Sequence, residues 1–404
     1  MPKVSSRGLA LPPSPIRKLS PYADAAKARG VKVFHLNIGQ PDLETPKVMR
    51  DRLKSIDPVI AYSPSAGTPQ YLAAMCRYYA TVGLHIEPAN VVATTGGSEA
   101  LFFAFLCLAE AGDEVIVAEP FYTNYNSFAA MAGVRLVPVQ SRGEEGFHLP
   151  PREAYEAALT PRTRFVLLCN PNNPTGTVYS REEVLRVATF CRDHDLFLVS
   201  DEVYREFVYD GLIATSALDL EGFEDRVVVV DSLSKRFSAC GIRLGCFVSR
   251  NAELIATVTR AAQGRLSPPG LAQVLALGMS EIGEDYHQGV RAEYQKRRDV
   301  LQEELEKLPG IFLRKPEGAF YVVARLPVSD SDDFARFLLE DFSFEGATVM
   351  VAPAAGFYAT PGLGMNEVRI AYVLNCDDLR RAIHVLGEGL KAYAQRAAPV
   401  LATA

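Results

Sequence analysis

The sequence lacks three features that often reveal the class of a protein. Its seven cysteines are scattered, odd in number and never spaced as CxxC, so neither a disulfide framework nor a zinc site is predicted. Basic residues are not in excess: 42 Lys and Arg stand against 48 Asp and Glu, and the net charge of −6 excludes a general nucleic-acid-binding protein. Long apolar runs are missing too, since the longest, 100–109, has about half the length of a membrane-spanning helix.

The first 21 residues contain five prolines and no apolar core of the kind that a secretion signal needs. Together with the unpaired cysteines, this predicts a cytoplasmic protein that binds no metal, no membrane and no nucleic acid. Of its 404 residues, 48% are hydrophobic and 22% are charged, which is typical of globular proteins. The length allows one large domain and a smaller one.

Seven short apolar segments rich in β-branched residues recur along the chain. They cover 91–94, 114–118, 135–139, 165–169, 196–200, 227–230 and 244–249. Most are apolar throughout, as in strands buried on both faces, and helical patterns at 100–109, 182–193 and 251–262 lie between them. This order predicts an α/β fold, with a mostly parallel seven-stranded sheet between helices in a large domain at 46–275.

The pattern changes after Pro268 and Pro269, where a long charged helical stretch covers 271–306. Short apolar segments at 320–324, 349–352 and 368–372 then alternate with helical patterns at 331–341 and 378–394. These elements predict a smaller α+β domain at 276–404. Residues 1–45 are predicted to form an N-terminal arm and part of that small domain.

Unusual residues follow the predicted strands where they end, which is the edge at which open parallel sheets bind ligands. Gly97 and Ser98 lie in a turn that leads into a helix, where free N–H groups and the helix dipole favour an anion. The alternative is that Ser98 only caps that helix. Tyr122 follows the next strand, as a site residue or as a core residue.

Two further strand ends carry polar groups. Asn173 belongs to the turn 170–176, which two prolines make rigid, and it offers a neutral donor. Asp201 directly follows a buried strand, where a carboxylate is costly unless a positive group meets it. Capping of a helix is the other interpretation of Asp201.

The turn after 227–230 combines hydroxyl groups, a lysine and an arginine. Ser232 and Ser234 precede Lys235, and Arg243 follows between two glycines. These groups suit a phosphate and a carbonyl electrophile, whereas the alternative is a solvated loop. Pyridoxal phosphate would explain all of the strand ends, because it needs a lysine for a Schiff base, an acid for its ring nitrogen, donors to its phenolate, a stacking ring and phosphate ligands.

Three motifs occur together in one order. They are Asn173-Pro174-Thr175-Gly176, Asp201-x-x-Tyr204 and Ser232-x-Ser234-Lys235-x-Phe237-Ser238-x-x-Gly241-x-Arg243. With them the chain resembles, over nearly its whole length, a class I/II aminotransferase of fold type I, similar to aspartate aminotransferase. The resemblance implies pyridoxal 5'-phosphate as the cofactor.

The resemblance also implies roles for the strand-end residues. Lys235 would form the Schiff base and transfer protons, Asp201 would pair with the pyridinium nitrogen, and Tyr122 would stack on the ring. Asn173 and Tyr204 would hydrogen-bond the phenolate oxygen, and Tyr204 joins Lys235 and Asp201 as a catalytic residue. The phosphate would be held by Gly97, Ser98, Ser232, Ser234 and Arg243.

Further positions are implied by the resemblance alone. Arg369 would bind the α-carboxylate of the substrate, and Gly39 and Asn173 would contact the substrate beside it. An ordinary ion pair and an ordinary turn are the alternatives for Arg369 and Gly39. Tyr62 would reach the phosphate of a neighbouring subunit, which makes the predicted protein a homodimer with shared sites.

The implied reaction moves an amino group from an L-amino acid to a 2-oxo acid, with 2-oxoglutarate as the expected acceptor and the donor left open. Some bacterial aspartate aminotransferases of this type carry a lysine at the position of Ser98 that reads a second carboxylate. Because this chain lacks it, we expect Arg265 to read that carboxylate. A C–S β-lyase, an aminocyclopropane-carboxylate-type lyase and a ligand-sensing regulator with an aminotransferase-like domain are the alternative functions, although a proline-rich arm of about twenty residues cannot supply a DNA-binding module.

Overall fold

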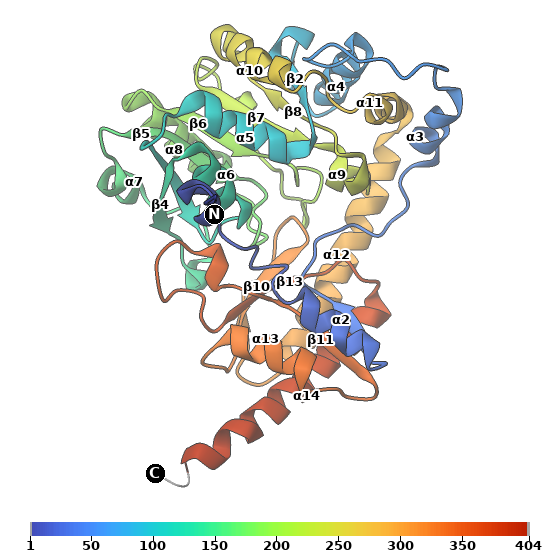
Figure 1. Ribbon diagram of the computed structural model, residues 1–404, viewed down its shortest axis with the longest axis vertical. Coiled ribbons are helices and arrows are strands. Elements are labelled where there is room, and N and C mark those ends of the chain that lie inside the picture. The colour runs from blue at the N-terminus through green and yellow to red at the C-terminus, as the bar shows by residue number, and fades with distance from the viewer. Residues whose placement is uncertain (1, 402–404) are drawn as a thin grey trace.

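All seven predicted strands join one sheet in the computed structural model, which describes residues 2–401 (Figure 1). The strands are β2 (Val91–Thr94), β3 (Glu114–Glu119), β4 (Arg135–Gln140), β5 (Thr163–Cys169), β6 (Phe197–Asp201), β7 (Val227–Ser232) and β8 (Gly245–Val248). Their order is β2-β8-β7-β6-β5-β3-β4, and every neighbouring pair is parallel except the two that include β8. The α/β class and the mostly parallel sheet are thereby confirmed.

Alternate residues of each strand pack into two separate cores, which explains why the strands are apolar throughout. In β5, Val166 and Leu168 face one core, whereas Phe165 and Leu167 face the other. The first core is covered by α4 (Pro69–Thr81), α7 (Arg152–Ala158) and α8 (Arg181–Asp193). The second is covered by α5 (Gly96–Leu108), α6 (Asn124–Ala132) and α10 (Ala252–Gly264).

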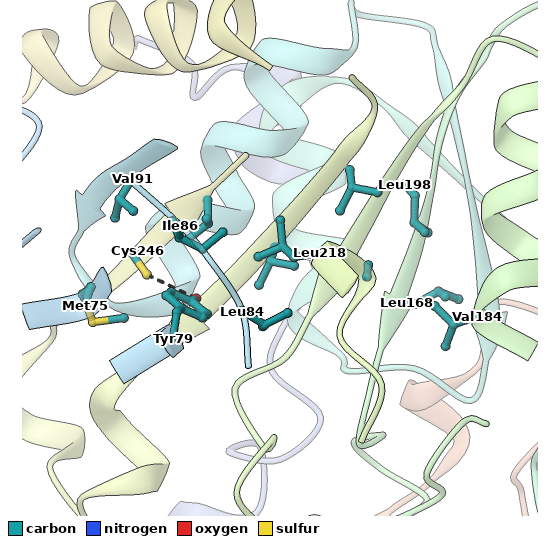
Figure 2. Close-up of a cluster of buried hydrophobic side chains, with 14 of the residues drawn as sticks. Met75, Tyr79, Leu84, Ile86, Val91, Leu168, Val184, Leu198, Leu218 and Cys246 are labelled. Carbon is teal, nitrogen blue, oxygen red and sulfur yellow. Dashed lines mark hydrogen bonds between the residues drawn. The ribbon is translucent and has the colours of Figure 1, made fainter. Parts of the chain in front are cut away.

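Figure 2 shows part of the first core. Tyr79 of α4 lies against Cys246 of β8, with 3.9 Å between the hydroxyl oxygen and the sulfur, and Val184 of α8 lies beside Leu168 of β5. A sheet that is buried on both faces leaves the ends of its strands as the place where a ligand can approach.

Two smaller sheets lie apart from the large one, in the lower half of Figure 1. One is a parallel pair of β1 (Lys32–His35) and β11 (Ala347–Met350). The other is antiparallel, in the order β12 (Ala352–Pro353), β13 (Glu367–Ala371), β10 (Tyr321–Arg325) and β9 (Phe312–Leu313). Four helices share a core with these sheets: α2 (Ser20–Ala28), α12 (Glu284–Glu306), α13 (Ser331–Glu340) and α14 (Cys376–Leu401).

Two predicted elements are divided in the structure. The helical stretch 271–306 consists of α11 (Gly270–Ala276), the 3₁₀ helix η6 (Leu277–Glu281) and α12. The break brings Gly278 so close to another helix that a Cβ there would lie 2.7 Å from Met49 Cα. The apolar segment 349–352 spans the end of β11 and the start of β12, because the chain passes from one small sheet to the other at Val351.

The remaining short elements connect these layers. They are α1 (Ser6–Leu9), α3 (Lys47–Asp51), α9 (Leu233–Arg236), η1 (Arg52–Ser55), η2 (Pro88–Asn90), η3 (Gly143–Glu145), η4 (Ala217–Asp219), η5 (Cys240–Ile242) and η7 (Ala355–Phe357). All strands of the large sheet fall within the predicted domain 46–275, and those of the two small sheets fall outside it. The domain boundaries themselves stay a prediction.

Among residues 2–401, no helix combines the length and the apolar character that crossing a bilayer requires. The same part of the chain contains no cluster of three or more His, Cys, Asp or Glu that could hold a metal ion.

Candidate active site

Six strands of the large sheet run in the same direction and end at one edge, and the antiparallel β8 begins there. A cavity of about 520 Å³ is lined by residues that follow these strands and by residues of the small sheets. Twelve of the predicted site residues line it: Gly39, Gly97, Ser98, Tyr122, Asn173, Asp201, Tyr204, Ser232, Ser234, Lys235, Arg243 and Arg369.

Asp201 and Asp231 are two buried aspartates on neighbouring strands with opposite surroundings. Asp231 receives two hydrogen bonds of 2.8 Å from Arg236 and lies 3.4 Å from Arg205, and these charges hold its pKa below the usual range even though burial raises it. From residues 2–401, the Asp201 carboxylate accepts two hydrogen bonds, from the hydroxyl of Tyr125 at 2.9 Å and from the backbone N–H of Val203 at 3.4 Å.

Burial therefore raises the pKa of Asp201 to about 7, against the lowering effect of the Tyr125 hydrogen bond. No Lys, Arg or His of the described residues forms an ion pair with it. A buried carboxylate at a cavity is costly without a positive partner, so this one is suited to a cationic group of a ligand.

Lys235 lies in α9, the single helical turn that follows β7, and the Ser232 hydroxyl caps this turn by accepting from the Ser234 N–H at 3.2 Å. The lysine Nζ donates to the carbonyl oxygen of Gly39 at 2.8 Å and lies 3.8 Å from the sulfur of Cys240. Within residues 2–401, no carboxylate lies within ion-pair distance of it. The amine can therefore react without breaking an ion pair.

A set of anion-binding groups collects at the start of α5. Gly97 and Ser98 lie in its first turn, where backbone N–H groups have no partner within the helix. The Arg243 guanidinium lies so close to this turn that a Cβ on Gly96 would be 2.5 Å from its Nη2. The hydroxyls of Ser232 and Ser234 are 2.8 Å apart, and Arg243 Nη1 lies 3.5 Å from Ser234 Oγ.

Arg369 enters the cavity from β13 and is 2% exposed. It donates to the side-chain oxygen of Asn173 at 3.1 Å and to the Asn37 carbonyl at 2.5 Å, and its guanidinium lies 4.4 Å from the centre of the Tyr321 ring. Its Nε is buried without a hydrogen-bond partner, and no carboxylate of the described residues pairs with it. A buried guanidinium with a spare donor at a cavity is suited to a carboxylate from outside the chain.

Two side chains, Asn173 and Tyr321, connect Arg369 to Tyr204. Asn173 Nδ2 donates to the Tyr204 hydroxyl at 3.3 Å, and the Tyr204 and Tyr321 hydroxyls are 3.0 Å apart. Burial, together with the neighbouring Tyr321, raises the pKa of Tyr204 well above its usual value. Tyr204 therefore remains a protonated donor at neutral pH.

Several residues that line the cavity were not predicted. Tyr321 comes from β10, Cys240 precedes Arg243 by three residues, and Arg17 comes from the N-terminal arm. The aromatic pair Phe320-Tyr321 was a visible signal of a special position. The sequence does not show that Tyr321 lies next to Arg369, because this contact depends on the pairing of β10 with β13.

Two predicted residues lie elsewhere. Tyr62 is outside the cavity of its own chain and is 82% exposed, so its role across a subunit boundary stays a prediction. The prediction for Arg265 is wrong: its Nε lies 3.0 Å from both carboxylate oxygens of Glu99, and its other nitrogens donate to the carbonyls of Ser65 and Ala93. These bonds occupy all three nitrogens away from the cavity.

This sheet and this cavity, with a lysine, a buried acid and an anion site at one edge, define an α/β enzyme of the fold type I class. The family model for aminotransferase class I and II matches residues 31–386. The chain therefore belongs to the class I and II aminotransferase family, whose members depend on pyridoxal phosphate.

Known relatives agree along almost the whole chain. The aspartate/prephenate aminotransferase of Thermus thermophilus is 32% identical over 394 residues, which cover 94% of this chain and 97% of that protein. The structure of the Thermus thermophilus aspartate aminotransferase with maleate has a TM-score of 0.86 at 30% identity, and that of an alanine aminotransferase from Pyrococcus furiosus has 0.88 at 27%. Each comparison covers 96% of this chain and 100% of the other. These relatives do not favour the lyase and regulator alternatives.

Proposed function

We propose that this aminotransferase binds pyridoxal 5'-phosphate in the cavity at the sheet edge and is attached to it through Lys235. The observation that carries the proposal is the contrast between the two buried aspartates. Arginines neutralise Asp231, whereas Asp201 lines the cavity without a cation. A protonated ring nitrogen is the partner that Asp201 lacks.

The other parts of the cavity fit the same group. The first turn of α5, the two serine hydroxyls and Arg243 provide the donors that a phosphate needs. Tyr122 offers a ring for stacking, and Asn173 and Tyr204 offer donors for a phenolate oxygen. Gly39 lies beside Lys235 and Tyr321, and its carbonyl accepts from the lysine.

Pyridoxal phosphate supplies, when bound, an aldehyde that condenses with amines and a ring that withdraws the electron pair left by proton removal. Arg369 binds the α-carboxylate of the amino acid and so fixes the orientation of the substrate. Lys235 Nζ takes the proton from the substrate Cα and returns it in the reverse direction. The Asp201 carboxylate stabilises the positive charge on the ring nitrogen, and the Tyr204 hydroxyl donates to the phenolate.

The amino group then passes to a 2-oxo acid in the second half-reaction, for which 2-oxoglutarate is the proposed acceptor. The relatives are named for aspartate, prephenate and alanine. Their names therefore support an amino acid as donor and leave its side chain open.

The proposed active form is a homodimer in which Tyr62 reaches the phosphate site of the partner subunit. Tyr62 lies in an exposed apolar patch with Val59 and Ile60, which are 76% and 63% exposed. The exposed Leu266 lies next to this segment, since Ser65 Oγ donates to the Leu266 carbonyl at 2.5 Å. An exposed apolar patch of this kind is typical of an interface between proteins.

Covalent labelling tests the proposal. We expect borohydride treatment of the protein saturated with pyridoxal phosphate to fix a pyridoxyl group on the peptide that contains Lys235, as read by mass spectrometry. Lys235→Ala should bind the cofactor without becoming labelled, and its transamination should fall by about 10²- to 10⁴-fold. A label on another lysine, or transamination by Lys235→Ala at the parental rate, would contradict the assignment.

A further inference from the structure

Arg17 is the second arginine, besides Arg369, that lines the cavity without a role in the proposed cofactor site. Among the described residues, its guanidinium has neither a hydrogen bond nor an ion pair. Asp201 is the sole carboxylate among the lining residues. The cavity therefore offers two cations to a substrate: Arg369 is buried, whereas Arg17 is exposed to solvent.

The backbone around Arg17 is held in place by the small sheets. The Pro15 ring packs so closely on Gly356 that a Cβ there would lie 2.4 Å from Pro15 Cγ. The Ile16 carbonyl accepts from Asn37 Nδ2 at 3.3 Å, and Arg17 N–H donates to the Ser14 carbonyl at 3.1 Å. Leu19, two residues later, is buried. The position of Arg17 is thus fixed, while its side chain stays available.

The next residue, Lys18, is also a cation, but it is neutralised by a carboxylate. Lys18 forms an ion pair with Asp332 of α13, and it does not line the cavity. The two adjacent cations thus have opposite surroundings: Lys18 pairs with a carboxylate of α13, whereas Arg17 has no partner among the described residues and lines the cavity.

Tyr122 shows that both arginines act on the same part of the cavity. Burial raises the pKa of its phenol to about 12, and the positive charges of Arg369 and Arg17 both oppose this rise. Both guanidinium groups therefore lie within electrostatic reach of one hydroxyl. Besides the cofactor-site residues, Arg17 is therefore the cation of this cavity that remains for a second anionic group of a substrate held by Arg369.

We propose that Arg17 binds the second carboxylate of dicarboxylic amino acids and their oxo acids, such as glutamate and 2-oxoglutarate. The proposal rests on the proposed function, because Arg369 must hold the α-carboxylate for Arg17 to read the other one. Arg17 replaces Arg265 in this role, since each nitrogen of Arg265 already donates to Glu99 or to a backbone carbonyl. A guanidinium can bind a carboxylate through two parallel hydrogen bonds, which gives selectivity for an acidic side chain.

The test compares half-reactions of the cofactor-loaded enzyme with glutamate and with alanine, followed by the absorbance of the cofactor. Alanine has no side-chain carboxylate, so it is the internal reference. In Arg17→Gln, the ratio of kcat/KM for glutamate to that for alanine should fall by about 10- to 100-fold. Lys18→Gln is the matched control, with the same charge removed one residue away, and its ratio should equal that of the parent.

Calorimetry provides a second readout that does not depend on turnover. Maleate, a dicarboxylate, should bind Arg17→Gln at least 10-fold more weakly than the parent, whereas the affinity for the monocarboxylate propionate should change by less than about twofold. An unchanged glutamate-to-alanine ratio, or an equal loss with both amino acids, would overturn the proposal for Arg17. Absence of any half-reaction in the parent enzyme would instead overturn the proposed function.

Discussion

Asp201 and Asp231 differ in their neighbours by a few side chains, and this difference has a measurable consequence for folding. The folded protein without cofactor keeps a proton on Asp201 up to about pH 7, whereas the unfolded chain loses it near pH 4. The folded state therefore binds more protons in this window, and the free energy of unfolding falls as the pH rises through it.

Asp201→Asn should remove this pH dependence. In urea unfolding of the cofactor-free protein, we expect the variant to gain about 2–3 kcal/mol relative to the parent between pH 5 and pH 8. Asparagine can still accept from Tyr125, so the local packing is kept. Added pyridoxal phosphate should stabilise the parent more than the variant. Parallel pH profiles for the two proteins would show that Asp201 is ionised in both states.

At the scale of elements, the site depends on the contact between the segment after β1 and the first residue of β10. A Cβ on Gly39 would lie 1.8 Å from the Tyr321 hydroxyl and 2.4 Å from its ring carbon Cζ. A side chain at 39 would therefore displace Tyr321 from Tyr204 and from the face of Arg369.

Gly39→Ala should lower the free energy of unfolding by about 1–3 kcal/mol and raise KM for the amino donor at least tenfold, because Arg369 loses its support. Urea unfolding and steady-state kinetics measure the two effects. The control is Gly289→Ala in α12, where nothing lies within 4 Å of the added methyl group. That change should stabilise the helix by about 0.5–1 kcal/mol and leave KM as it was. Parental KM in Gly39→Ala would show that Tyr321 can move freely.

The strands of the large sheet were predicted to within about two residues, because strands buried on both faces have an unambiguous apolar pattern. The site residues that directly follow these strands could be located from the sequence, because the ends of the strands were predicted correctly. The break inside the helical stretch 271–306 and the helix α2 were not predicted. The break between α11 and α12 follows from the approach of Gly278 to α3, and α2 begins with Pro21 in its first turn after a proline-rich arm.

Two of the site residues that escaped prediction share one cause. Tyr321 and Arg17 reach the cavity through the small sheets, whose pairings join segments far apart in the chain. Arg265 was mispredicted because its charge suggested a free cation, whereas Glu99 on α5 neutralises it. Local patterns do not show which charges meet in space. The cytoplasmic location also stays a prediction.

At the scale of the whole molecule, the proposed dimer predicts that two inactive variants can complement each other. Tyr62→Ala damages the partner's site, and Lys235→Ala destroys its own. In a mixed dimer, one site combines both defects, and the other has an intact Lys235 and an intact Tyr62. At limiting cofactor, mixing the two variants should restore activity to about half of the parental value per mixed dimer.

Sedimentation and the activity of the mixture measure this outcome. Each variant alone, carried through the same dissociation and reassociation, is the control and should stay impaired. If Tyr62 served its own chain, no mixed dimer would contain an intact site, and the mixture would show no gain.

The pairing of β1 with β11 sets the order in which the molecule can be completed during translation. The large sheet has all of its strands once residue 248 has left the ribosome, whereas Phe34 must wait for Val349 to find its partner. The nascent chain thus holds all strands of the large sheet, and Lys235 beside them, while β1 is still unpaired. The pairing of β1 with β11 therefore joins the start of the chain to its C-terminal third only after the large sheet has been synthesised.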